Sequence, residues 1–295
     1  MSDVIVVNIS GGLGNQMFQY AAGCALANRL GRKLSVVCDM HTFYGSRSHY
    51  QLKNIFNIQV SEIDQQDMRR IFGWRGGSQV RRLMSKPLGR WLRDRKLVFE
   101  PHFHYWSAFE RLVHVNYLHG YWQSDRYFKG HETAIRQAFS FVSKPGIQDM
   151  AVIDLMRQQA SVAVHVRRGD YTNAKNRQVY VQADLAYYKR AIQYFKSTLG
   201  APKFFVFSDD PAWVREHLLV DESMVLVDHN SGETSFNDMR LMSLASHNII
   251  ANSTFSWWGA WLNENPNKQV VAPRGWFQSE GMNSSDVCPD SWIKL

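Results

Sequence analysis

Apolar runs punctuated by glycine open the chain. Residues 4–9 read Val-Ile-Val-Val-Asn-Ile, a pattern typical of a strand buried on both faces of a parallel sheet. A glycine-rich turn over residues 10–14 follows. The alanine-rich stretch from Asn15 to Leu30 then predicts a helix that ends at Gly31, and residues 34–39 predict a second strand. This strand–loop–helix–strand order indicates an α/β domain.

The second half of the chain repeats the alternation of apolar runs and helical patterns. Strands are predicted over residues 161–166, 203–207, 224–227, 248–251 and 269–272, and helices over residues 184–199, 211–219, 235–246 and 254–263. Successive βα units of this kind predict a mostly parallel sheet, which binds its ligands at the carboxyl ends of its strands.

A length of 295 residues suits two domains of moderate size. We expect the boundary near residues 143–160, which gives an N-terminal domain over residues 1–150 and a C-terminal domain over residues 151–295. Residues 61–97 are polar, then strongly basic, and contain several glycines, so we interpret them as an insertion outside the core. Residues 110–142 return to the first domain.

Composition narrows the classes of partner. The net charge of +8 favours anionic partners such as a nucleotide, a diphosphate lipid or an anionic membrane surface. Nucleic acid is a weaker expectation, because no basic–aromatic module stands out. Apolar residues make up 45% of the chain, enough for a substantial core. Cys24, Cys38 and Cys288 have unrelated spacings, so neither a disulfide framework nor a zinc site follows, and a reducing cytoplasm fits best.

No segment of the sequence predicts export or membrane insertion. The first residues lack a basic region followed by a long apolar run, and no window reaches about 18 uninterrupted apolar residues. We therefore expect a cytoplasmic protein, with peripheral contact at the inner face of a bacterial membrane as an open alternative.

The glycine loop Gly11-Gly12-Leu13-Gly14-Asn15-Gln16 is the first candidate site. Glycines after a first strand let a ligand approach the backbone, and the helix that follows offers N–H groups. The loop matches neither the dinucleotide fingerprint nor a P-loop. The structural alternative is a tight turn with Asn15 as the helix cap.

The second candidate is the motif His165-Val166-Arg167-Arg168-Gly169-Asp170, at the end of an apolar strand. Unpaired charge there is costly, and the planar fork of arginine suits a diphosphate. Strand alternation places His165 and Arg167 on one face and Arg168 on the other. The alternative for Arg168 is a structural salt bridge with Asp170.

Two further strand ends carry polar residues. Phe207-Ser208-Asp209-Asp210 precedes Pro211, so one acid suits a helix cap and the other suits a base or ribose. Ser253 and Thr254 suit either a helix cap or a phosphate. We expect Trp257 and Trp258 to lie in the core. These two tryptophans belong to the run Asn252-Ser253-Thr254-Phe255-Ser256-Trp257-Trp258.

The sequence contains no Asp-x-Asp pair, which many sugar-nucleotide enzymes use to hold a divalent cation on the diphosphate. We therefore predict no metal site and no cofactor. Arginine and a helix N-terminus supply the positive charge in this interpretation.

These four motifs, in this order from residue 11 to about residue 261, resemble the bacterial α1,2-fucosyltransferases of glycosyltransferase family 11. The His-x-Arg-Arg-x-Asp motif is shared more widely with α1,6- and protein O-fucosyltransferases. The glycine loop and the run Ser253 to Trp258 point more narrowly to the α1,2 group. The resemblance implies a GT-B architecture, in which two Rossmann-like domains face a cleft. The N-terminal domain would lie on the acceptor side, and the C-terminal domain would bind GDP-fucose.

The resemblance also implies an inverting, metal-independent transfer of L-fucose from GDP-β-L-fucose to the 2-hydroxyl of a galactose-type acceptor. The acceptor glycan would be an O-antigen or oligosaccharide, with a lipid-linked form as an alternative. Other readings stay open, namely α1,6 or α1,3 linkage, or a nucleotide- or carbohydrate-binding module without turnover. The sequence does not indicate an oligomeric state.

The family motifs imply roles for individual residues. The catalytic candidates are Arg167 on the β-phosphate, Asp170 as base, and Asn15 on the donor phosphate or sugar. The departing phosphate is the alternative proton acceptor. The residues expected to bind substrate are Gly12, Gly14, Asn15, Gln16, His165, Arg167, Arg168, Asp209 (a candidate for guanosine), Ser253, Thr254 and Phe255.

The segment from Arg69 to Lys96 contains ten basic residues and a single acid, Asp94. Apolar residues fall among them at roughly helical spacing, although Pro87 interrupts the pattern. A basic amphipathic stretch of this kind can bind an anionic membrane. A solvated charged face is the alternative.

Overall fold

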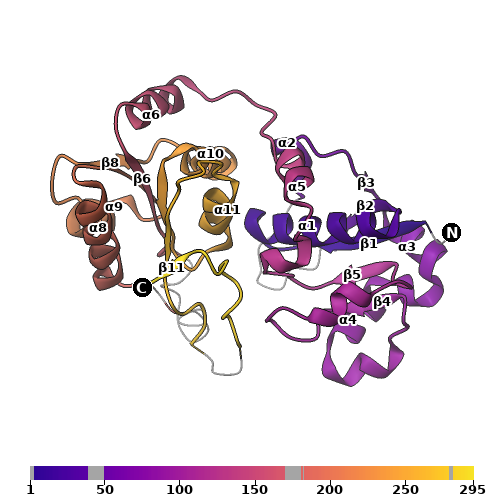
Figure 1. Cartoon of the computed structure of the whole chain (residues 1–295). Coiled ribbons are helices and arrows are strands. Elements are labelled where there is room, and N and C mark those ends of the chain that lie inside the picture. Colours follow the sequence, from indigo (N-terminus) through magenta and orange to yellow (C-terminus); the bar gives the residue numbers. More distant parts are fainter. Residues whose placement is uncertain (1–2, 39–49, 170–180, 182, 279–281) are drawn as a thin grey trace. The chain divides into compact units, whose positions relative to one another are not determined.

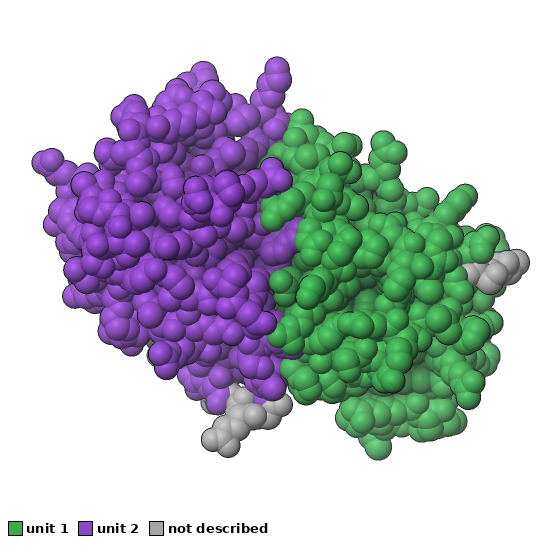
Figure 2. Space-filling model, viewed as in Figure 1, with its two compact units in different colours: residues 1–142 green, residues 143–295 purple. Residues whose placement is uncertain are grey.

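The computed structural model describes residues 3–38, 50–169, 181, 183–278 and 282–295, and it divides into two compact units. Unit 1 comprises residues 1–142 and unit 2 comprises residues 143–295 (Figure 2). The division falls after Val142 rather than at residue 150, so the helix of residues 147–157 belongs to unit 2.

Unit 1 is a parallel sheet in the order β3-β2-β1-β5-β4 (Figure 1). Its elements, in chain order, are β1 (Val4–Ile9), α1 (Leu13–Leu30), β2 (Lys33–Cys38), α2 (Leu52–Ile55), β3 (Ser61–Glu62), α3 (Gln65–Phe72), η1 (Gly73–Gly76), α4 (Ser78–Ser85), η2 (Pro87–Leu92), β4 (Leu97–Phe99), η3 (Ser107–Arg111), β5 (Tyr117–His119), η4 (Asp125–Phe128) and α5 (Glu132–Ala138). The strand order changes direction between β1 and β5, which is where parallel α/β sheets place their ligands.

Helix α1 lies close to the sheet because small residues line its inner face. A Cβ at Gly23 would clash with Val7 of β1, so only glycine permits this approach. Gly31 adopts φ +62° and ends the helix, as predicted, with its N–H bonded to the carbonyl of Asn28.

Residues 61–97 are not outside the core, so that interpretation was wrong. Met68 of α3 and Met84 of α4 are fully buried against Val6 and Val37 on the face of the sheet whose side chains alternate with those under α1. The segment is mostly polar and basic, so its few apolar residues did not show a clear core-facing pattern in the sequence. The segment therefore completes unit 1.

Unit 2 is a parallel sheet in the order β11-β10-β9-β6-β7-β8. Its elements are α6 (Ile147–Arg157), β6 (Ser161–Val166), α8 (Leu185–Leu199), β7 (Lys203–Ser208), α9 (Pro211–His217), β8 (Met224–Val227), η6 (Gly232–Thr234), α10 (Phe236–Leu244), β9 (His247–Ile249), α11 (Thr254–Leu262), β10 (Val270–Ala272) and β11 (Ile293–Lys294). The strands run outward in both directions from β6, which is the doubly wound Rossmann order with its switch point between β6 and β9.

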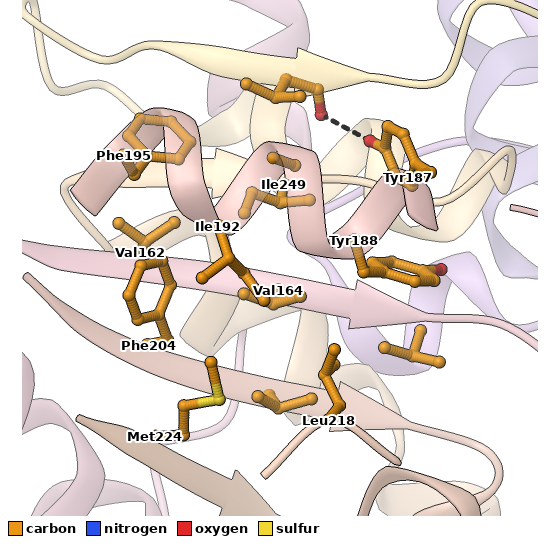
Figure 3. Close-up of a cluster of buried hydrophobic side chains, with 14 of the residues drawn as sticks. Val162, Val164, Tyr187, Tyr188, Ile192, Phe195, Phe204, Leu218, Met224 and Ile249 are labelled. Carbon is orange, nitrogen blue, oxygen red and sulfur yellow. Dashed lines mark hydrogen bonds between the residues drawn. The ribbon is translucent and has the colours of Figure 1, made fainter. Parts of the chain in front are cut away.

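The apolar runs predicted as strands form the centre of unit 2. In Figure 3, Ile192 of α8 points toward Val164 of β6, and Phe195 of α8 belongs to the same buried cluster as Val162 of β6 and Phe204 of β7. All five side chains are buried, because a strand covered on both faces exposes no side to water. The two α/β units confirm the predicted fold class, the GT-B type with two Rossmann-like domains.

Candidate active site

Two charged loops leave the sheet of unit 2 side by side. Strands β6 and β7 pair in register, with His165 opposite Phe207 and Val166 opposite Ser208. The residues that follow each strand therefore emerge at the same edge. This pairing joins two motifs that are distant in the sequence into one site.

Asp209 holds the loop after β6. One carboxylate oxygen accepts the backbone N–H of Arg168 at 2.8 Å, and the other accepts that of Gly169 at 3.0 Å. The second oxygen also pairs with Nη1 of Arg167 at 2.9 Å. A Cβ at Gly169 would lie 2.7 Å from this oxygen, so glycine is needed there. Both carboxylate oxygens thus orient Arg167 and its loop, while the predicted contact of Asp209 with guanosine stays a prediction.

Arg168 is tied to the neighbouring acid. Its Nε donates to Asp210 at 3.2 Å, and its guanidinium carbon lies 4.2 Å from the centre of the Trp213 ring. Asp210 also accepts the N–H of Trp213 at 3.1 Å, which confirms it as the N-cap of α9. The salt bridge of Arg168 is therefore with Asp210. Asp170, its expected partner and our candidate base, lies outside the described residues.

The alternation that we used to separate the two arginines does not apply to them. Strand β6 ends at Val166, so Arg167 and Arg168 both lie in the loop. Both pair with the adjacent acids Asp209 and Asp210. Loop geometry, rather than the faces of a strand, decides where their side chains go.

His165 is a neutral group beneath these charges. The residue is 5% exposed, and burial together with the nearby Arg167 lowers its pKa to about 3. Its ring centre lies 5.7 Å from that of Phe255, and Nδ1 is buried with no hydrogen-bond partner among the described residues. An uncharged imidazole here can make a hydrogen bond to a ligand without adding to the local charge.

The loop after β9 adjoins the same edge, because β9 pairs with the other side of β6. Ser253, Thr254 and Phe255 are partly exposed at the start of α11. Ser253 occupies the N-cap position, but its side chain makes no capping bond, so the predicted side-chain cap is wrong. Trp257 and Trp258 are fully buried, which confirms their assignment to the core.

Unit 1 presents an uncharged loop at the carboxyl end of β1. The helix begins at Leu13 with Gly12 as its N-cap, so Asn15 lies within the first turn and is not the cap. Gly12 is exposed, and no atom lies within 4 Å of the position where its Cβ would be. Asn15 is half-buried, and its side-chain oxygen accepts a hydrogen bond from Gln123 at 2.9 Å.

Two predicted binding residues of this loop lie inside the fold. Gln16 is 1% exposed, donates to the carbonyl of Gly11 at 3.0 Å and accepts the N–H of Gln51 at 3.0 Å. Gly14 is also buried. Both residues therefore shape the loop, whereas Gly12 and Asn15 lie at its surface.

The sequence reasoning missed the loop after β5. The carboxylate of Glu100 accepts the backbone N–H groups of Tyr121 at 2.7 Å and Trp122 at 3.0 Å. These bonds hold Trp122 at φ +56°, the only positive φ outside glycine among the described residues. Such strain is common where a backbone is held for function. Little in the sequence indicates this loop, because the strand before it, Tyr117–His119, has only three residues and shows no clear periodicity.

A polar cluster at the carboxyl end of β8 was also missed. Asp149 accepts hydrogen bonds from Nε2 of His229 at 2.8 Å and from Asn230 at 3.0 Å, and Asn230 also donates to Asp238 at 3.0 Å. Burial raises the pKa of Asp149, but hydrogen bonds from Asn230, His229 and the N–H of Gly146 outweigh burial and lower it overall. Burial raises the pKa of Asp238 to about 7. The cluster could not be predicted from a local sequence motif, because its members come from three separate segments of the chain.

The described residues contain no group of three or more His, Cys, Asp or Glu side chains placed to hold a metal ion. The part of the chain that the structure describes also contains no helix with the length and apolar character needed to cross a membrane.

Residues 101–295 match the family model of glycosyl transferase family 11. The chain belongs to this family. It is 32% identical to an alpha-1,2-colitosyltransferase of Escherichia coli over 99% of both chains. It is also 32% identical to the O-antigen biosynthesis glycosyltransferase WbnK of Escherichia coli, over 97% of this chain and 99% of that one. The family predicted from the motifs is confirmed.

More distant relatives extend the picture. The galactoside alpha-(1,2)-fucosyltransferase 2 of Oryctolagus cuniculus is 27% identical over 87% of this chain and 66% of its own. Among solved structures, the NodZ alpha-1,6-fucosyltransferase soaked with GDP-fucose has a TM-score of 0.53 at 18% identity, over 89% of this chain and 93% of NodZ. At that identity the likeness establishes the fold. The family 11 chain described here is a glycosyltransferase related to α1,2-fucosyltransferases.

Proposed function

We propose that this glycosyltransferase transfers L-fucose from GDP-β-L-fucose to the 2-hydroxyl of a galactose-type acceptor, with inversion and without a metal ion. Family membership and the galactoside α1,2-fucosyltransferase relatives support the linkage. The O-antigen relative supports a bacterial surface glycan as the acceptor.

One observation carries the proposal, the arginine that Asp209 holds at the switch point of unit 2. Arg167 is charged, 31% exposed in its side chain, and oriented before any ligand binds. A planar guanidinium can grip a phosphate through two hydrogen bonds. Negative charge grows on the β-phosphate as its bond to fucose breaks, so a preorganised cation at that position stabilises the transition state.

In this reaction the 2-hydroxyl oxygen of the acceptor attacks the anomeric carbon of fucose from the face opposite GDP. The new glycosidic bond forms as the bond to the β-phosphate oxygen breaks, and GDP leaves with the electron pair. The hydroxyl proton passes to a carboxylate, for which Asp170 is the candidate, or to the departing phosphate. Asn15 would contact the donor phosphate or sugar, Ser253 and Thr254 the nucleotide phosphates, and neutral His165 the nucleotide.

The experiment is incubation of the purified chain with GDP-fucose and a panel of galactosides, with GDP release measured and the linkage of the product determined. An α1,2-fucoside formed undiminished in a strong chelator is the expected result. An α1,6 or α1,3 product would correct the linkage. Binding of GDP-fucose without turnover would indicate a binding module, and turnover restored only by manganese or magnesium would reveal a metal site.

A second candidate donor follows from the colitosyltransferase, one of the relatives that match this chain over nearly its whole length. Colitose is fucose without its 3-hydroxyl, so the same phosphate and nucleotide contacts suit both donors. Competition between GDP-fucose and GDP-colitose under the same assay separates the two candidates. A higher kcat/KM for GDP-colitose would replace fucose in the proposal and leave the roles of Arg167 and Asp209 unchanged.

A further inference from the structure

The helical layer of residues 65–96 has two unlike faces. We call it the basic layer; it comprises α3, η1, α4, η2 and the residues that lead to β4 (Figure 1). Met68 and Met84 anchor its inner face, and both side chains are fully buried against the sheet. Its outer face carries large apolar side chains that a self-contained fold has no reason to expose.

Four apolar side chains of the basic layer are exposed. Leu88 is 86% exposed, Trp91 81%, Trp74 57% and Leu83 46%. Tertiary contacts bring their segments together. Nε of Arg75 donates to the carbonyl of Leu92 at 2.9 Å. Arg75 follows Trp74 and Leu92 follows Trp91, so this bond links the segments that carry the two tryptophans.

A second contact joins the remaining pair of side chains. A Cβ at Gly89 would clash with the carbonyl of Leu83, so η2 lies directly on the end of α4. Leu88 and Leu83 are thereby brought to the same part of the layer. The four apolar side chains belong to one packed piece of structure, not to separate loops.

Nine of the ten cations of the layer fall into an inner and an outer set, and the tenth, Arg70, pairs with Asp67 at 2.9 Å. Arg75, Arg81 and Arg93 donate to backbone carbonyls of Leu92, Gly76 and Met84 and so hold the layer together. The outer set has no ion-pair partner among the described residues and consists of Arg69, Arg82, Lys86, Arg90, Arg95 and Lys96. Salt-bridge partners would normally accompany charges whose role is structural.

We propose that the basic layer docks the enzyme on an anionic phospholipid bilayer. Exposed tryptophan and leucine suit the boundary between headgroups and acyl chains, and unpaired lysine and arginine suit the negative headgroups. The combination favours a lipid surface over a nucleic acid, which would leave Leu88 and Trp91 without an apolar partner. This surface goes beyond the transfer reaction and would hold the enzyme beside membrane-borne glycans.

The test is sedimentation of the full chain with vesicles made of equal parts of phosphatidylcholine and phosphatidylglycerol, beside vesicles of pure phosphatidylcholine. We expect binding to the anionic vesicles that weakens as salt is raised. Each cation near such a surface contributes about fivefold in affinity, so the double variant Lys86→Glu/Arg90→Glu should bind at least about twenty-five-fold more weakly. Leu88→Ser/Trp91→Ser should also bind more weakly.

Matched variants in unit 2 control for charge and apolar surface in general. Lys189→Glu/Arg190→Glu on α8 reverses two positive charges at exposed positions, as the Lys86/Arg90 variant does. Val220→Ser replaces an apolar side chain whose residue is 66% exposed. Both controls should bind vesicles as the wild type does, and all variants should transfer sugar to a soluble acceptor at the wild-type rate. Failure of the wild type to bind anionic vesicles, or equal losses in the unit 2 controls, would overturn the proposal.

Discussion

The carboxyl edges of the two sheets are built from the same βα turns but from opposite chemistry. In unit 1 the loop after β1 is uncharged, and the side-chain oxygen of Asn15 accepts a hydrogen bond from the amide of Gln123. The carboxylate of Glu100, after β4, accepts backbone N–H groups of the neighbouring loop. In unit 2 the edge is dense in charge, with Arg167 paired to Asp209 and Arg168 paired to Asp210. One topology thus supports two different kinds of recognition.

The difference fits the two halves of a sugar-transfer reaction. A nucleoside diphosphate carries charge that must be matched, and it gains more charge as it leaves. A neutral sugar needs hydrogen bonds of defined direction, which amides supply without an electrostatic field. Under the proposed function, the charged edge of unit 2 would bind the donor phosphates. The following variants test that assignment, from the largest expected effect to the smallest.

Arg167→Lys should cause the largest loss of turnover among these variants. Lysine keeps the charge but loses the planar fork, and removal of one preorganised donor costs on the order of a hundredfold in turnover. We expect a folded variant that still binds GDP and transfers almost nothing. Turnover is measured at saturating GDP-fucose after folding is verified by circular dichroism.

Arg168→Lys is the matched comparison and should lose less, because Arg168 is committed to Asp210 and Trp213. Near-normal turnover of Arg167→Lys would refute the role given to that arginine. A larger loss at Arg168 would mean that the two arginines have exchanged roles.

Asp209→Asn should lower turnover by about tenfold, because a reacting group misplaced by even a fraction of an ångström is costly. Asparagine keeps the size of the side chain but cannot accept from Arg167, Arg168 and Gly169 together. A positioning role predicts that kcat falls while the KM for GDP-fucose changes little. A rise confined to that KM would instead favour the contact with guanosine that the sequence suggested.

Gln123→Ala tests the uncharged loop after β1. Loss of its hydrogen bond to Asn15 should cost about 1 kcal/mol, or roughly fivefold. If Asn15 contacts the donor phosphate or sugar, as proposed, the change should appear in the KM for GDP-fucose. A change confined to the KM for the galactoside would show that Asn15 faces the acceptor instead.

Asp238→Asn tests whether one carboxyl group at the edge of unit 2 is protonated rather than charged. Because its pKa is raised from 3.8 to about 7, the folded protein keeps a proton over this range that the unfolded chain has lost. The free energy of unfolding contributed by Asp238 is therefore greatest below its unfolded pKa and falls as pH rises toward 7.

The Asp238→Asn variant should accordingly show a flatter pH profile of the unfolding midpoint in urea across pH 4–7. His229 and Asp149 are the titratable groups nearest to Asp238 in the cluster, so His229→Gln serves as a control for their contribution. Profiles of equal slope for the wild type and Asp238→Asn would show that Asp238 is ionised in the folded protein.

The sequence alone was enough to predict the two α/β units, the central strands and the family. Uninterrupted apolar runs such as residues 161–166 leave little choice but a buried strand, and the glycine and arginine motifs are local in the chain. The short strands β3, β4, β5 and β11 were not predicted, because two or three residues carry too little periodicity to be distinguished from a loop.

Tertiary structure alone decided which residues meet. Asp209 holds Arg167 because β6 and β7 pair in register, and Met68 and Met84 anchor the basic layer because the sheet offers them an apolar face. Asp149, His229 and Asp238 form a cluster although they are scattered along the chain. Sequence patterns record local preference and periodicity, whereas these contacts depend on strand register and on the packing of elements that are distant in the chain.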